Sequence, residues 1–104
     1  MPDLDDVTYE RVTSLCEQGD GLAHEQRYDE AIRCYQAAWE WLPEQRHSWN
    51  VALWITMVVG DAHFLSSRFA DARASFTLAM LLGGTENPFV HLRLGESFFE
   101  LGRH

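Results

Sequence analysis

An internal repeat is the feature that most constrains how this chain of 104 residues folds. Residues 19–38 align with residues 60–79 at one constant offset. The matched pairs are Gly19 with Gly60, Asp20 with Asp61, Arg27 with Arg68, Tyr28 with Phe69, Ala31 with Ala72, Tyr35 with Phe76, and Ala38 with Ala79. A third, partial copy starts at Pro88 and places Gly95 at the position of Gly19 and Gly60. A fixed period of about 20 to 50 residues is typical of stacked units, so we expect a repeat architecture.

Each copy has the pattern of two helices. Over residues 28–42, apolar residues recur at steps of three and four, which is typical of one helix face. Pro43 follows this segment and favours its end. The matching helix of the second copy is expected over about 69–82, closed by Gly83 and Gly84, whose positive φ angles would end it. No segment has the alternating pattern of a strand, so the chain is predicted to be all-α.

Three glycines lie inside helical patterns at one repeated position. Gly19, Gly60 and Gly95 each cost about 1 kcal/mol relative to alanine in a helix interior. Their recurrence predicts a close helix crossing at which no side chain would fit.

The sequence resembles the tetratricopeptide repeat in its order of residues. An apolar residue and Gly in a first helix are followed by an aromatic residue, Ala, an aromatic residue and Ala in a second helix, with Pro closing the first copy. The resemblance covers repeat one at 12–45, repeat two at 53–86 and a half repeat at 88–104, and it is strongest over residues 87–102. It implies one domain over 1–104, built as a right-handed superhelical stack of antiparallel helix pairs with about five helices.

The repeat period departs from that family. The family period is about 34 residues, whereas the step from Gly19 to Gly60 is longer by about two helical turns. We place the additional turns at 46–52, which would lengthen the first helix of repeat two to roughly 48–67. Residues 5–11 are expected to extend the first helix of repeat one.

The resemblance also implies a concave groove, lined by the first helices, that binds a peptide or a partner's helix. Carried over position by position, the residue after each repeated glycine faces this groove and is acidic: Asp20, Asp61 and Glu96. Further groove candidates at helical spacing are Cys16, Ala23, His24, Trp54, Met57, Phe64, Leu65, Leu92, Phe99 and Glu100. The three carboxylates are either solvated helix charges or selectors of a basic ligand, and both interpretations stay open here. A large amphipathic ring such as Trp54 would make a binding hot spot.

Charge and composition limit the classes of partner. The net charge is −8, and all eight cations are Arg. Nucleic acids and anionic membranes are therefore unexpected partners, because both attract basic faces. The acidic start lacks the basic and apolar regions of a secretory signal. No apolar stretch approaches the ~20 residues that cross a bilayer, so we expect a soluble, cytoplasmic protein. Cys16 and Cys34 match no zinc or redox spacing and are expected to be reduced thiols.

Catalytic motifs are missing from the sequence. The five histidines have no metal-binding spacing, and the Gly-Asp-Gly at 19–21 lacks the remainder of a phosphate-binding loop. His63 and His91 stand at positions that the family packs, so we expect them to be core or boundary residues. We expect no catalytic residue, no metal and no cofactor.

The last helix carries apolar residues that need cover. Phe89, Leu94, Phe98 and Leu101 would form an exposed face unless a longer protein continues the stack or a second copy pairs with it as a homodimer. The leading hypothesis is a non-enzymatic module that binds a basic or mixed basic-apolar segment of another protein. A bacterial immunity protein that neutralises a toxin and a secretion chaperone would both fit. The alternative is a structural scaffold that assembles through its C-terminal helix.

Overall fold

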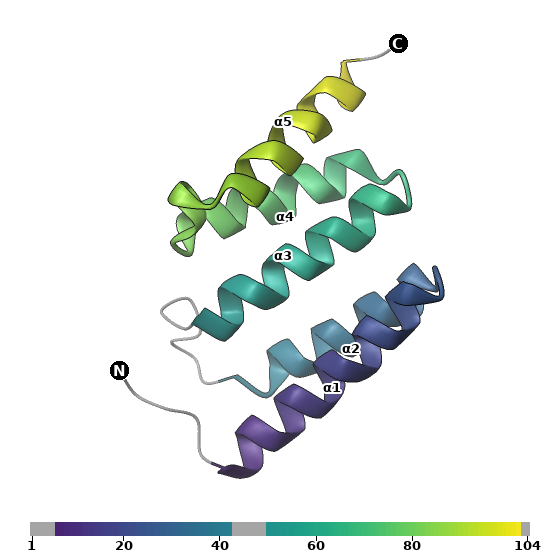
Figure 1. The fold of residues 1–104 in the computed structure, drawn as a ribbon, viewed down its shortest axis with the longest axis vertical. Helices are drawn as coiled ribbons and strands as arrows, with labels where there is room; N and C mark the ends of the chain where they lie inside the picture. Colours follow the sequence, from purple (N-terminus) through teal and green to yellow (C-terminus); the bar gives the residue numbers. More distant parts are fainter. Residues whose placement is uncertain (1–5, 43–49, 103–104) are drawn as a thin grey trace.

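The computed structural model describes residues 6–42 and 50–102. Over these residues the chain forms five α-helices and no strand, which confirms the all-α prediction. The helices are α1 (Asp6–His24), α2 (Tyr28–Glu40), α3 (Asn50–Leu65), α4 (Phe69–Leu81) and α5 (Pro88–Leu101), with a short 3₁₀ helix η2 (Gly84–Glu86) before α5. α1 with α2 and α3 with α4 form two antiparallel pairs, and α5 follows them along the long axis of the molecule (Figure 1).

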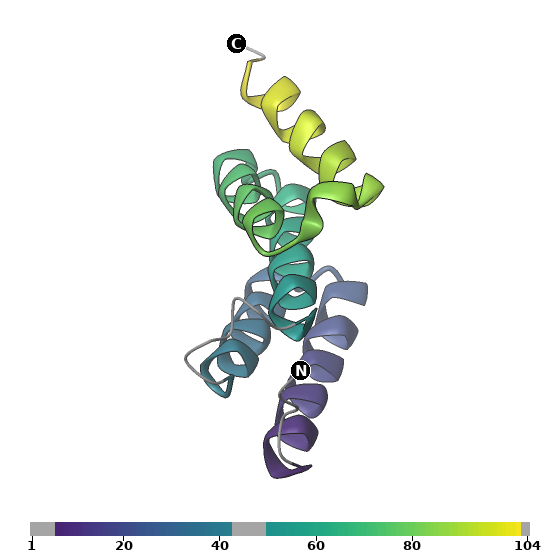
Figure 2. The same ribbon diagram turned by 90° about the vertical axis from the view of Figure 1, so that its left-hand side faces the viewer.

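The helices form two layers. Figure 2 shows α2 and α4 on one side of the stack and α1 on the other, with α3 between them; α5 begins on the side of α1 and slants across toward the side of α4. Hollows between α1 and α3 and between α3 and α5 indent the face that these three helices form, which we call the concave face. This is the face on which the groove was expected.

The two helix pairs close with the same turn. Gln26 and Ser67, which occupy equivalent positions of the two copies, both have a φ of 65°. In the second pair, the backbone N–H after Ser67 donates to the carbonyl of His63 over 2.8 Å, and the equivalent bond in the first pair ends on Leu22 over 2.9 Å. The repeat in the sequence is therefore also a repeat of backbone conformation.

Two of the three repeated glycines lie at close helix crossings. A Cβ atom built on Gly19 would lie 2.5 Å from Cε1 of Tyr35, and one on Gly60 would lie 3.0 Å from the ring of Phe76. At Gly95 the prediction is wrong, because nothing lies within 4 Å. In the described chain no helix stands against α5 in the way that α2 stands against α1 and α4 against α3.

Small residues and one aromatic ring build each half of the core. Tyr35 packs in the first cluster and Phe76 in the second, each between buried alanines at repeated positions. The buried residues of the first cluster are Val12, Cys16, Ala31, Tyr35, Ala38, Leu42, Ala52 and Ile55, and those of the second are Ala72, Phe76, Ala79 and Val90. Alanine lets the helices approach closely while the ring fills the space between them.

Most helix ends agree with the sequence analysis. α4 ends at Leu81, one residue early, and of the two glycines that follow only Gly83 adopts a positive φ, at 109°. α3 ends two residues before the expected 67, and its expected start at 48 and most of the additional turns at 46–52 lie outside the described residues. In the part of the chain that is described, no helix combines the length and apolar character required to cross a membrane.

Candidate partner-binding groove

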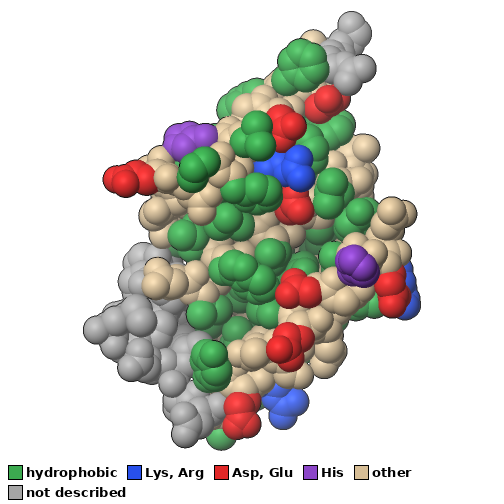
Figure 3. Space-filling model, viewed as in Figure 1, with side chains coloured by type: hydrophobic (Ala, Val, Ile, Leu, Met, Phe, Trp, Pro, Cys, Tyr) green, Lys and Arg blue, Asp and Glu red, His purple; other side chains and the backbone are tan. Residues whose placement is uncertain are grey.

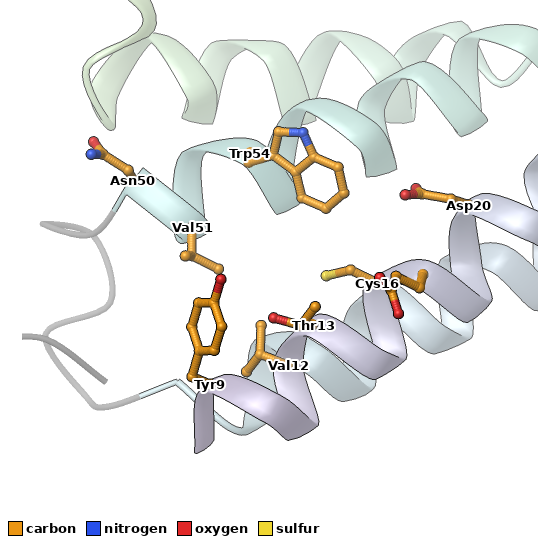
Figure 4. Close-up of a pocket in the computed structure, with 9 residues that line it drawn as sticks. Tyr9, Val12, Thr13, Cys16, Asp20, Asn50, Val51 and Trp54 are labelled. Atoms are coloured by element: carbon orange, nitrogen blue, oxygen red, sulfur yellow. The ribbon is translucent and has the colours of Figure 1, made fainter. Parts of the chain in front are cut away.

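A hollow of about 460 Å³ lies between α1 and α3 on the concave face (Figure 4). Val12 and Cys16 of α1 and Val51 and Trp54 of α3 give it apolar walls, and the indole of Trp54 points into it. The remaining lining residues are Tyr9, Thr13, Glu17, Asp20 and Asn50. Its charged lining residues, Glu17 and Asp20, are both acidic, so the hollow combines apolar contact with negative charge.

A second hollow, of about 290 Å³, continues from the first along the same two helices. The two share Asp20, and the second adds Asp61, Val58 and Leu65 from α3. Its other lining residues are Ala23, His24, Tyr28, Tyr35 and Ala62. We call the two hollows together the α1/α3 groove. Asp20, His24, Trp54, Asp61 and Leu65, all expected from the sequence, line it.

Hydrophobic and acidic side chains occupy separate areas of the concave face. In Figure 3 hydrophobic side chains lie along the middle, over α3, and acidic side chains lie beside them over α1. Trp54 is 41% exposed within this region, and its ring meets that of Tyr35 edge-on at 6.5 Å between centroids. A buried ring therefore supports the indole from behind.

Asp20 is held in place from the core. The hydroxyl of Tyr35 donates to Oδ1 of Asp20 over 2.7 Å. Burial, and secondarily this bond to the carboxylate, raises the pKa of Tyr35, so the phenol stays protonated. Burial, with a smaller effect from Asp20, also raises the pKa of Cys16 to about 11. The Cys16 thiol is therefore protonated at neutral pH and is a poor nucleophile.

Asp20, Asp61 and Glu96, which follow the three repeated glycines, form an acidic row, and Arg93 of α5 joins the last two of them. Its Nε donates to Oδ1 of Asp61 over 2.8 Å, and its Nη1 donates to Oε1 of Glu96 over 3.1 Å. The guanidinium carbon also lies 4.5 Å from the ring centroid of Phe64 and 5.4 Å from that of Phe89. Arg93 was not among the residues expected in the groove, although it stands three positions before Glu96, a spacing that pairs charges on a helix.

A third hollow, of about 500 Å³, lies where α5 meets the end of α3. It is lined by Phe64, His91, Leu92, Gly95, Glu96, Phe99 and Glu100. The expected groove residues Phe64, Glu96, Phe99 and Glu100 are thus brought together here, apart from the α1/α3 groove. Met57 lines neither, because it packs against the second core cluster and its sulfur accepts a hydrogen bond from Asn87.

The expected apolar face of α5 divides into two parts. Phe89 and Leu94 do not belong to an exposed face, because they pack against the second core cluster; Phe89 meets Phe76 edge-on at 5.9 Å. Phe98 is 54% exposed, with the guanidinium of Arg73 from α4 5.8 Å from its ring, and Leu101 is half-buried. The register of α5 on α4 turns the first two residues inward.

Two histidines, His63 and His91, were expected to be core or boundary residues. His63 is half-buried as expected, and its Nδ1 accepts a hydrogen bond from Nε of Arg68 over 3.2 Å. Burial lowers the pKa of His63, so it is neutral at pH 7. His91 was expected to be packed but is exposed, with its Nε2 against the carbonyl of Thr85. Within residues 6–42 and 50–102, no three His, Cys, Asp or Glu side chains gather in a way that could hold a metal ion.

Comparisons with protein-family models, with curated proteins and with solved structures found no match to this chain.

Proposed function

We propose that this chain is a tetratricopeptide-type repeat protein whose α1/α3 groove binds a segment of another protein without catalysing a reaction. The observation that carries the proposal is the 460 Å³ hollow, in which apolar walls surround a half-exposed Trp54 and the charged lining is acidic. Such a surface is complementary to a segment that carries both apolar and basic side chains.

Affinity would come from the apolar contacts and partner selection from the charges. An indole held by Tyr35 loses little conformational freedom on binding, which is typical of hot-spot residues. Glu17 and Asp20 would attract cations, and the net charge of −8 would speed their approach at low ionic strength. A cytoplasmic immunity protein against a basic toxin and a secretion chaperone are two roles consistent with such a site.

Selection from a random peptide library displayed on phage tests this function. We expect the chain to enrich peptides that combine apolar residues with Lys or Arg. Trp54→Ala should weaken the selected peptides at least about tenfold, as loss of a hot-spot side chain does. Trp41→Ala is the matched control, because Trp41 is similarly exposed but lines neither hollow of the groove. Failure to enrich any peptide, or equal losses in both variants, would contradict the proposal.

Self-assembly through α5 is a second candidate function, favoured by Phe98 and Phe99, which are 54% and 66% exposed. If α5 pairs with another copy, sedimentation at micromolar concentration should detect a dimer. Phe98→Glu should then return the protein to monomer, because it places a charge in an apolar contact. Leu81→Glu, on an exposed residue of α4, should leave the dimer intact. A wild-type protein that sediments as a monomer would remove this candidate.

A further inference from the structure

The repeat relates two places on the concave face, one between α3 and α5 and one between α1 and α3. In the repeat alignment Gly95 matches Gly60, and Gly60 matches Gly19. Each residue of the first place therefore has an equivalent residue in the second. The guanidinium of Arg93 is surrounded by Asp61, Phe64, Phe89 and Glu96. One repeat earlier, Val58 is the equivalent of Arg93, and the four neighbours are Asp20, Ala23, Trp54 and Asp61, in the same order. Both carboxylate positions are thus acidic in both places.

The place between α3 and α5 shows how these positions bind a guanidinium. Asp61 of α3 accepts a hydrogen bond from Nε of Arg93, and Glu96 of α5 accepts one from Nη1. The ring of Phe89, four residues before Arg93 in α5, lies 5.4 Å from the guanidinium carbon. The side chain of Arg93 is only 21% exposed. One cation therefore satisfies two carboxylates in a partly desolvated site, where charge-assisted hydrogen bonds are strong.

The related place between α1 and α3 has the carboxylates but a different residue at the position of Arg93. Val58 stands there and is too short to reach between Asp20 and Asp61. Ala23 replaces the ring of Phe64, which widens the space further. The result is the hollow of about 290 Å³ lined by both carboxylates. Trp54, at the position of Phe89, lines the adjoining hollow of about 460 Å³, and Asp20 lines both hollows.

We propose that this hollow binds the guanidinium of an arginine side chain from the partner segment, between Asp20 and Asp61, at the end that adjoins the hollow lined by Trp54. The inference rests on the proposed function and specifies the ligand chemistry of the same groove. It does not rest on the acidic pair alone, because Asp61 already ligates a guanidinium in the repeat-related place.

The hydrogen bonds already made leave room for this ligand. Tyr35 donates to Oδ1 of Asp20, and Arg93 donates to Oδ1 of Asp61. A carboxylate offers two oxygens and about four acceptor positions, so each can accept an additional N–H. A planar guanidinium donates in several directions at once and stacks on an indole, whereas an ammonium is a compact and more strongly hydrated charge. Arginine is therefore expected to bind better than lysine.

Titration of the folded protein with N-acetyl-arginine methylamide, followed by NMR, tests the proposal. We expect saturable shifts of the Trp54 indole N–H and of the backbone amides of Asp20 and Asp61. The lysine and leucine analogues should bind at least about fivefold more weakly. Equal binding of the three compounds, or no shift at these residues, would overturn the proposal.

Val58→Arg provides the sharpest variant, because it would place the chain's own guanidinium where Arg93 stands one repeat later. It should keep the fold and weaken binding of the arginine compound at least tenfold. Val7→Arg adds the same charge at an exposed residue outside the groove and should leave binding within twofold. Asp20→Asn, at an exposed position, should also weaken binding and serves if Val58→Arg does not fold. Undiminished binding in whichever of the two variants folds would overturn the proposal.

Failure of this inference is distinguishable from failure of the proposed function. If library peptides bind in a Trp54-dependent way but prefer Lys, or lose no affinity in Val58→Arg, the groove binds a partner without an arginine site. If no peptide binds, the proposed function itself fails.

Discussion

Gly19→Ala is expected to destabilise the protein by about 2 kcal/mol, whereas Gly21→Ala, two residues later in the same helix, is expected to stabilise it by about 1 kcal/mol. At Gly19 the new Cβ would lie 2.5 Å from a ring atom of Tyr35, whose side chain is only 2% exposed and has little space into which to move. At Gly21 nothing lies within 4 Å, so only the better helix propensity of alanine acts. Urea unfolding followed by circular dichroism measures both changes.

The same pair of variants connects the core to the groove. Displacement of Tyr35 by Gly19→Ala would disturb its hydrogen bond to Asp20 and its edge contact with Trp54. We therefore expect Gly19→Ala, but not Gly21→Ala, to change the fluorescence spectrum of the folded state. Equal effects of the two substitutions on stability would mean that α1 does not cross α2 closely at Gly19.

Phe76→Ala is expected to destabilise the protein by about 3 to 5 kcal/mol, the range for loss of a buried aromatic ring. Phe76 is fully buried at 0% exposure, and it contacts residues of α3, α4 and α5 in the second core cluster. Because the free energy of unfolding of a native protein is only about 5–15 kcal/mol, a loss of this size would remove a large part of it. Thermal unfolding, with the wild-type chain as reference, measures the loss.

Phe99→Ala is the matched control for that substitution. Phe99 is 66% exposed on α5, so its removal should change the free energy of unfolding by less than about 1 kcal/mol. A loss as large as that of Phe76→Ala would show that another chain covers Phe99 in solution, since an exposed ring contributes little to the stability of a monomer. The comparison therefore also bears on self-assembly through α5.

The prediction of the fold from sequence worked because it used local signals. The spacing of Tyr28, Ala31 and Tyr35 indicates one face of a helix. The same spacing recurs in the second copy and predicts an equivalent helix there. Gly19 and Gly60 were expected at close crossings because a glycine inside a helix needs a packing reason, and the rings of Tyr35 and Phe76 supply it. Gly95 was also expected at a close crossing, but nothing lies within 4 Å of it, because no second helix of that repeat follows it in the described chain.

The arrangement of the candidate site depended on contacts between distant parts of the chain. Asp61 and Arg93 are 32 residues apart and meet only because α5 packs beside α3. The acidic row of Asp20, Asp61 and Glu96 therefore has an internal cation at one end that no spacing argument within a single helix could reveal. Likewise, Phe89 and Leu94 turn inward because of the register of α5 on the second core cluster.

By itself, then, the sequence determined the helices, their pairing and the acidic and apolar character of the concave face, because helical periodicity and the repeat act over one or two turns and recur at a fixed spacing. Only the tertiary structure decided that Asp61 and Glu96 bind Arg93 and that Asp20 and Asp61 line one hollow. Those outcomes depend on the angle and register at which one helix packs on the next. Phe64 and Ala23 occupy equivalent repeat positions. The large ring of Phe64 contacts Arg93 between α3 and α5, whereas the small Ala23 leaves a hollow between α1 and α3.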